Sequence, residues 1–168
     1  MPTTYEPIAT TTLNSSASSI SFSSIPSTYT DLKLIFVPLS AAGGNFYIRF
    51  NSDTGNNYTY SYITYLDGGY AGSTGTATSL ISGSPGLTNG LNGTYPNLYD
   101  ININSYTNTS IYKNCLFSFY EQHGLGGTSA SGGYVIGNWA STDAITSIQL
   151  EADWDSGTTA TLYGIKKA

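Results

Sequence analysis

The sequence is poor in charged residues and in cysteine. Asp, Glu, Lys and Arg make up 9% of its 168 residues, whereas a typical globular domain has about 25%. A single cysteine, Cys115, excludes an intrachain disulfide. Cys115 stands in an apolar run with Leu116 and Phe117, which is typical of a small buried side chain and not of a reactive thiol. The stability of the fold therefore has to come from an apolar core.

Long apolar runs, heptad repeats and clusters of basic residues are missing too. Without a run of about 18 apolar residues, we expect no membrane-spanning helix, and without heptads a coiled coil is excluded. The net charge is −5, and the only adjacent basic residues are Lys166 and Lys167, so nucleic-acid binding by counterion release is not expected. The stretch Met1–Thr4 lacks the basic and apolar parts of a secretory signal, so none is expected either.

The sequence is instead rich in Ser and Thr (23 of each), Gly (19), Tyr (15) and Asn (13), with a hydrophobic content of 39%. Short segments alternate between apolar and polar residues, as half-buried strands do. The clearest are 31–37, which stops at Pro38, and 111–122, the longest. Further strands are predicted at 20–22, 45–50, 98–104, 134–139, 148–154 and 159–165.

This pattern predicts one all-β domain over residues 1–168, an antiparallel jelly-roll-like β-sandwich of eight to ten strands. Three segments remain open. Residues 58–66 fit a strand or a short helix, and residues 67–97 fit a long loop or a pair of weak strands. The polar segment 1–19 fits an edge strand or an extended N-terminal arm that reaches a neighbouring chain.

No catalytic residue is expected. His123 is the only histidine and leaves a strand for a predicted Gly-rich loop at 123–133. A Ser/His/Asp set needs a marked nucleophile, and the sequence has no G-x-S-x-G elbow. We therefore interpret His123 as an ordinary residue at the edge of a loop. Phosphate loops, dinucleotide fingerprints and zinc-ligand spacings are absent as well, so no cofactor is expected.

The acidic residues Glu151, Asp153 and Asp155 alternate along one predicted strand, opposite the apolar residues Leu150 and Trp154. Residues at i, i+2 and i+4 of a strand share one face, so we interpret the three as a solvated face. A Ca²⁺ site built from Asp153 and Asp155 is one alternative. A hydrolase that uses Glu151, Asp153 or His123 is the other, although a flat strand face offers no cleft.

The tyrosines offer candidates for an interaction surface. Tyr58, Tyr60, Tyr62, Tyr65 and Tyr70 lie within thirteen residues, and the first four are interface candidates. Tyrosine combines a large apolar ring with a polar tip, which favours interfaces and also allows stacking on sugars. Core filling, a subunit interface and a glycan platform all remain open for these residues. The interface candidates also include Ile8 and Leu13, the only aliphatic points of the polar N-terminal segment.

Both ends of the domain resemble a known group of proteins. The segments 145–150 and 156–166, the latter ending in Leu-Tyr-Gly-Ile-Lys, are similar to the C-terminal end of small virion proteins of tailed bacteriophages, notably cyanophages. The segments 20–26 and 31–34 are similar to their opening. The resemblance covers about residues 18–50 and 134–167, and the middle of the chain is not part of it.

The resemblance implies a β-sandwich on the outside of a virion, without enzymatic activity. The expected function is that of a capsid decoration or cement protein, which binds and stabilises the lattice of the major capsid protein, as a trimer. The alternative is a tail-fibre or tail-tip module that binds a carbohydrate on the host surface. The resemblance carries no catalytic residue, metal or cofactor over to this chain.

Overall fold

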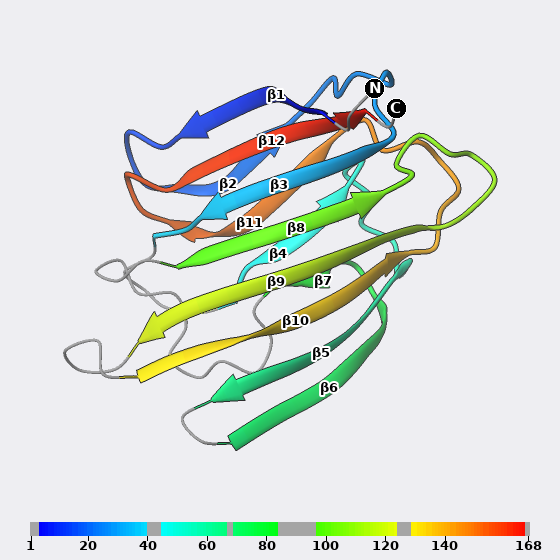
Figure 1. The fold of residues 1–168 in the computed structure, drawn as a ribbon. Helices are drawn as coiled ribbons and strands as arrows, with labels where there is room; N and C mark the ends of the chain where they lie inside the picture. The colour runs from blue at the N-terminus through cyan, green and yellow to red at the C-terminus, as the bar shows by residue number, and fades with distance from the viewer. Residues whose placement is uncertain (1–3, 40–44, 67–68, 84–96, 124–128, 167–168) are drawn as a thin grey trace.

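The computed structural model describes residues 4–39, 45–66, 69–83, 97–123 and 129–166. These residues form twelve strands and no helix, arranged as two antiparallel sheets that face each other (Figure 1). The all-β sandwich predicted from the sequence is confirmed. The strands are β1 (Thr4–Thr12), β2 (Ala17–Phe22), β3 (Asp31–Val37), β4 (Tyr47–Phe50), β5 (Tyr58–Leu66), β6 (Gly69–Thr78), β7 (Ile81–Ser82), β8 (Leu98–Asn104), β9 (Lys113–His123), β10 (Ser129–Trp139), β11 (Ile148–Trp154) and β12 (Thr159–Lys166).

Eight of the strands follow jelly-roll connectivity. The small sheet has the order β2-β11-β4-β7, and the large sheet begins with the order β1-β12-β3-β8. The chain crosses from one sheet to the other at each of the steps β1–β2, β2–β3, β3–β4, β7–β8 and β11–β12. First and last strands pair side by side, as in a jelly roll made of two Greek keys.

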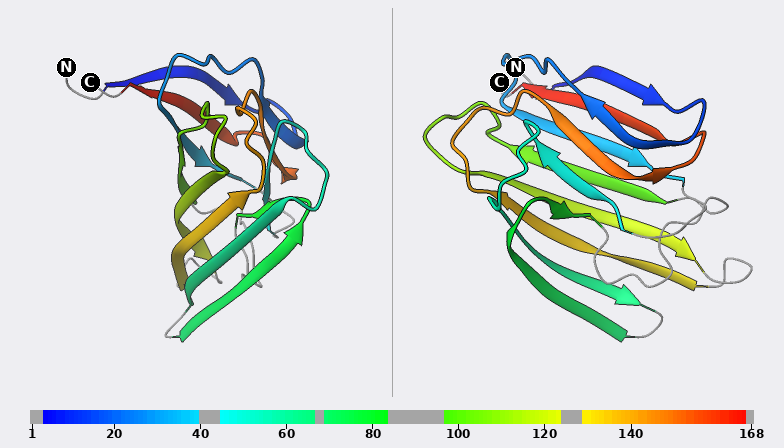
Figure 2. Two further views of the ribbon diagram at one scale, coloured as in Figure 1. Left: turned by 90° about the vertical axis from the view of Figure 1, so that its right-hand side faces the viewer. Right: turned by 180° about the vertical axis from the view of Figure 1, so that it is seen from behind.

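Two hairpins enlarge the large sheet to eight strands. The hairpin β5–β6 is inserted between β4 and β7, and the hairpin β9–β10 between β8 and β11. Together they extend the large sheet in the order β9-β10-β5-β6. The side view and the view from behind show that β5 and β6 reach beyond the small sheet (Figure 2). We call these four strands the extension and the strands β1, β12, β3 and β8 the jelly-roll half.

The core lies between the sheets and is strongly aromatic. Phe36 of β3, Phe46 before β4 and Trp154 of β11 are buried, and their rings meet at centroid distances of 5.0–6.0 Å. A second group forms where the extension begins, with Trp139 stacked on Tyr58 at 6.3 Å. The strict alternation of buried and exposed residues in β12 and β8 matches the pattern of half-buried strands.

The strand count is higher than predicted because weakly patterned segments also pair. Residues 58–66 form a strand, and the segment 67–97 contributes β6 and β7, with 84–96 outside the described residues. The predicted loop 123–133 was partly wrong, since β10 begins at Ser129. Glycine is needed inside this strand: a Cβ on Gly133 would lie 2.2 Å from the carbonyl oxygen of Ile63 on β5. The Gly-rich composition marks close backbone approach here and not a turn.

Residues 4–12 of the N-terminal segment form the edge strand β1. β1 pairs along its length with β12, with a bulge between Pro7 and Ala9. Ile8 and Leu13 are half-buried and pack against the core. Of the two alternatives for this segment, the structure has the one in which it completes the sheet of its own chain.

Candidate functional site

The outer face of the extension brings large exposed side chains into rows across the sheet. Tyr65 of β5 is paired with Tyr70 of β6 and with Gly132 of β10, and Gly132 is paired with Tyr120 of β9. Because cross-strand partners project from the same face, these tyrosines form one row, interrupted by Gly132. Tyr120 continues the row to Leu98 on β8.

A second and a third row complete this surface. Tyr134 of β10 is paired with Ile63 of β5, and Ile136 of β10 with Leu116 of β9. All of these side chains are between 43% and 75% exposed, with Tyr70 the most exposed. We define the outer patch as these eight side chains: Ile63, Tyr65, Tyr70, Leu98, Leu116, Tyr120, Tyr134 and Ile136.

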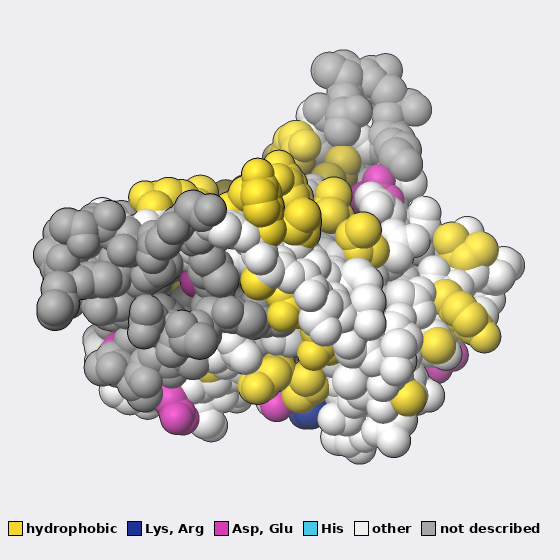
Figure 3. Space-filling view, turned by 90° about the horizontal axis from the view of Figure 1, so that it is seen from below, with side chains coloured by type: hydrophobic (Ala, Val, Ile, Leu, Met, Phe, Trp, Pro, Cys, Tyr) yellow, Lys and Arg dark blue, Asp and Glu magenta, His cyan; other side chains and the backbone are white. Residues whose placement is uncertain are grey.

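The outer patch is gathered on one side of the molecule. Figure 3, seen from the β6 side, shows hydrophobic side chains collected along the outer side of the large sheet, the upper side of that view. The four tyrosines of the outer patch are each about half exposed or more, and together they expose about 400 Å² of side chain to water. With the four aliphatic residues the patch is as large as those that are commonly functional on a monomer.

Charge is missing from this surface. On the outer side of β5, β6, β9 and β10, the described part of the chain carries Thr, Ser, Asn, Gln and Gly beside the outer patch and no Asp, Glu, Lys or Arg. The nearest outer charges are Asp100 of β8 and Lys33 of β3, which form a closed ion pair at 2.7 Å. An uncharged apolar surface loses little on desolvation, so it is suited to contact with another neutral surface.

The hollows on this face are shallow. One of about 280 Å³ is lined by Leu98, Asp100, Ser118, Phe119 and Tyr120. Another of about 250 Å³ is lined mainly by hydroxyl and amide side chains, together with Ile136 and Tyr60: Thr59, Ser61, Thr74, Thr76 and Asn138. Both are open to solvent, and neither collects the acid, base and nucleophile that an active site needs.

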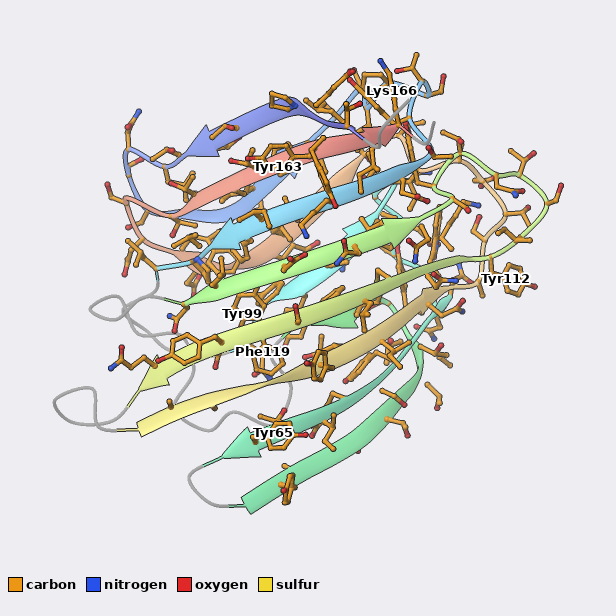
Figure 4. The ribbon with its side chains drawn as sticks, viewed as in Figure 1. Tyr65, Tyr99, Tyr112, Phe119, Tyr163 and Lys166 are labelled. Carbon is orange, nitrogen blue, oxygen red and sulfur yellow. The ribbon has the colours of Figure 1, made fainter. Side chains whose placement is uncertain are left out.

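The four candidate tyrosines divide between the two faces of β5. Tyr58 is fully buried, and its hydroxyl donates to the carbonyl of Phe50 and accepts from the Phe50 amide, so it is a core residue. Tyr60 and Tyr62 are half-buried and pack against the core. Tyr65 alone points outward, with its ring edge-to-face against Tyr70 at 5.0 Å (Figure 4). Of these candidates, only Tyr65 belongs to the outer patch.

Sequence reasoning missed most of the outer patch, although a signal was present. In β9 the apolar residues stand on both faces: Cys115 and Phe117 are buried, whereas Leu116 and Tyr120 are exposed. A strand with one solvated face normally carries polar residues there. Large apolar residues at both alternating positions therefore indicate that the outer face has a partner or meets unusually little water.

The acidic residues of β11 do not form a cluster. Glu151 is ion-paired with Arg49 of the neighbouring strand β4. Asp153 is exposed, and Asp155 is half-buried in the turn that follows. In the part of the chain that the structure describes, no group of three or more His, Cys, Asp or Glu side chains is placed to hold a metal ion. Of the three, only Asp153 is exposed to solvent.

A buried carboxyl group lies on the inner side of the extension. Glu121 of β9 is fully buried, and neither of its carboxyl oxygens has a hydrogen-bond partner. Burial raises its pKa to about 8, so the side chain is protonated and neutral at pH 7. Its register partner Ser131 and the nearby strand residue Thr64 also have buried hydroxyl groups without a partner. The inner side of the extension therefore holds a group of buried polar atoms without hydrogen-bond partners.

The thiol of Cys115 is not placed for chemistry. Cys115 is buried, and burial raises the pKa of its thiol to about 12, which keeps it protonated. This agrees with the interpretation as a small buried side chain. His123 is the last residue of β9, and its side chain lies outside the described part of the structure.

Comparisons with known proteins gave no relative. No protein-family model, no curated protein and no solved structure matches the chain. Within the described ranges, no helix is long and apolar enough to cross a membrane.

Proposed function

We propose that this chain is a non-enzymatic structural subunit of a phage virion, a capsid decoration protein that binds the major capsid protein through the outer patch. The observation that carries the proposal is the outer patch itself, eight large exposed side chains on a sheet face whose described residues in β5, β6, β9 and β10 carry no charge. Monomeric proteins rarely leave such a surface without a partner. The resemblance of both ends of the domain to phage virion proteins supports the choice of partner.

The shape of the surface favours a protein lattice over a small molecule. The extension is an array of four paired strands, and its hollows are shallow. Stable protein contacts bury about 800 Å² on each side and place aromatic residues near the centre. Tyr134 and Tyr120 occupy the middle of the outer patch, so we expect them to contribute most of the binding free energy.

The test measures binding to capsids of the encoding phage that were assembled without this protein. We expect the wild-type chain to cosediment with such capsids and to saturate at a fixed ratio. The double variant Tyr134→Asp/Ile136→Asp places two charges in the outer patch and should weaken binding at least 100-fold. The matched control is Tyr5→Asp/Val37→Asp, which changes two exposed residues of the jelly-roll half and should bind like the wild type.

Equal binding by the wild type and by Tyr134→Asp/Ile136→Asp would contradict the proposed binding surface. Absence of any binding of the wild type to capsids would contradict the proposed function. Circular dichroism of each variant checks that the sheets are intact, which we expect because all four positions are exposed.

A second candidate function is binding of a neutral glycan, and one observation favours it. Tyr120 and Tyr65 stand on either side of Gly132, so two exposed rings are separated by a gap two strands wide, about 10 Å. The neighbouring hollow is lined largely by hydroxyl and amide groups that hydrogen-bond to sugars. This function predicts binding on a glycan array that is lost in Tyr65→Ala and Tyr120→Ala, with no binding to capsids.

A further inference from the structure

The strand β6 leaves one edge of the large sheet open. It runs from Gly69 to Thr78, and among the residues that the structure describes it pairs on one side only, with β5. It contains no charged residue and no proline, and none of its residues is buried. From Gly69 to Gly75 the pairing with β5 is regular, and the register shifts only beyond Tyr60. Such an edge presents a row of free backbone donors and acceptors to another strand.

The opposite edge of the same sheet is protected. β1 carries Glu6, which is bound by Lys166 at 3.0 Å, and Pro7, which has no amide proton to donate. A bulge between Pro7 and Ala9 interrupts its regular geometry. Charge, proline and a bulge are the features by which natural sheets prevent the addition of a strand. A strand can therefore be added at β6 but not at β1.

We propose that β6 pairs with β6 of a second copy of this chain, antiparallel and about a two-fold axis perpendicular to the sheet. A strand that pairs with itself brings identical residues near one another, and like charges facing each other would oppose the pairing. β6 is neutral, and its side chains are small except for Tyr70, so self-pairing meets neither repulsion nor a steric conflict.

The two different edges of the large sheet also limit pairing through this sheet to two copies. Each chain has one open edge in the large sheet, and that edge is used up in the pair, while β1 on the far side is protected. The contact is isologous and closes, so it gives a dimer and not a filament. The two-fold axis keeps both outer patches on the same side, next to one another through Tyr70. If the proposed function holds, the dimer presents two binding surfaces to one lattice.

The test uses the purified protein alone and measures its mass in solution by size-exclusion chromatography with light scattering. We expect the wild type to form a dimer at micromolar concentration. Thr74→Lys places a charge on an exposed position of β6 and should raise the dimer dissociation constant at least tenfold. The second variant, Thr74→Lys/Thr76→Lys, should be monomeric.

The matched control is Ala9→Lys, an equal charge on an exposed position of the edge strand β1, which should leave the dimer unchanged. Amide hydrogen exchange adds a second readout, since Gly69–Gly75 should exchange more slowly in the wild type than in the β6 variants. A monomeric wild type, a dimer that survives both β6 variants, or a trimer such as the resemblance implies would each overturn the inference. None of these results depends on capsid binding, so they test the dimer and not the proposed function.

Discussion

The two halves of the large sheet differ in edge protection, in surface charge and in the pairing of buried polar groups. The jelly-roll half ends in a protected edge strand and carries ion pairs, Lys33 with Asp100 and Lys166 with Glu6. The extension ends in an open edge, has an uncharged outer face and holds an unpartnered Glu121 inside. The first half shows the features of a sheet adapted to water, and the second those of a sheet adapted to a partner.

The two ends of β9 show the same contrast at closer range. Lys113, at the end where the strand begins, is buried, and its ammonium group donates to the carbonyls of Asn108, Ile111 and Thr142 at 2.6–3.0 Å. Glu121, near the other end and on the same face, has no partner. A buried charge is tolerated when it is fully hydrogen-bonded, and otherwise the group is neutralised. Local stability should therefore fall along β9 toward Glu121.

The largest expected effect comes from replacing Glu121, the buried group without a partner. Glu121→Gln should stabilise the protein by about 3–5 kcal/mol at pH 9, the amount that corresponds to a pKa raised from 4.5 to about 8. Between these pH values the unfolded chain loses a proton that the folded chain retains, so the free energy of unfolding of the wild type falls as pH rises and levels off above pH 8.

Urea denaturation at several pH values measures the free energy of unfolding of the wild type and of Glu121→Gln. Below pH 4.5 the free energies of unfolding of the two proteins should differ only by the effect of the substitution on packing. The difference should grow as the pH rises to 8. If wild type and Glu121→Gln lose stability with pH at the same rate, Glu121 is not protonated in the folded state.

An intermediate effect compares a glycine in each half. Gly133→Ala in the extension should cost about 3 kcal/mol, because the new methyl group meets the backbone of β5, which cannot move without breaking the pairing. Gly164→Ala in the jelly-roll half should cost about 2 kcal/mol, because its methyl group meets the ring of Tyr29, a half-buried side chain that packs against the core and has to be displaced. Thermal and urea unfolding measure the stability of both variants. Equal losses of stability would contradict the idea that a clash with backbone costs more than a clash with a side chain.

The smallest expected effect concerns the ion pair of the jelly-roll half. A double-mutant cycle of Lys33→Met and Asp100→Asn should give a coupling of about 0.5 kcal/mol, since both side chains are partly exposed. The coupling should shrink in 1 M salt, where surface charges are screened. A coupling that is independent of salt would show that the contact acts through packing rather than charge.

The sequence predicted the strands β3, β8 and β12 of the jelly-roll half and β9 of the extension, whereas it left β1, β5 and β6 open. The residues 31–37 predicted a strand. In 148–154 the alternation also predicted the buried residues Ile148, Leu150 and Trp154, because one side of the strand meets the core. In β6 the residues are small and exposed on both faces, so no alternation marks the strand. Gly132 and Gly133 indicated a loop by composition, although their lack of side chains serves the close pairing of β10.

The candidate surface was only partly predictable for a related reason. Tyr65 was found because tyrosines cluster in β5, but Tyr58 from the same cluster is a core residue. Which face of a strand is buried depends on the register and on the second sheet, and neither is encoded in local spacing. The joining of Tyr120, Tyr65 and Tyr70 into one row follows from the strand order β9-β10-β5-β6, which brings together segments far apart in the sequence.

The pairing of the first and last strands has a practical consequence for engineering. Thr4 of β1 lies opposite Lys166 of β12, at the border of the large sheet far from β6 (Figure 1). A peptide or a fluorescent domain fused near either residue would therefore emerge beside the same corner, leaving the extension unobstructed. A short linker between β1 and β12 would allow a circular permutant whose new termini lie in another turn of the fold. A cargo fused to these new termini would then be displayed at that turn.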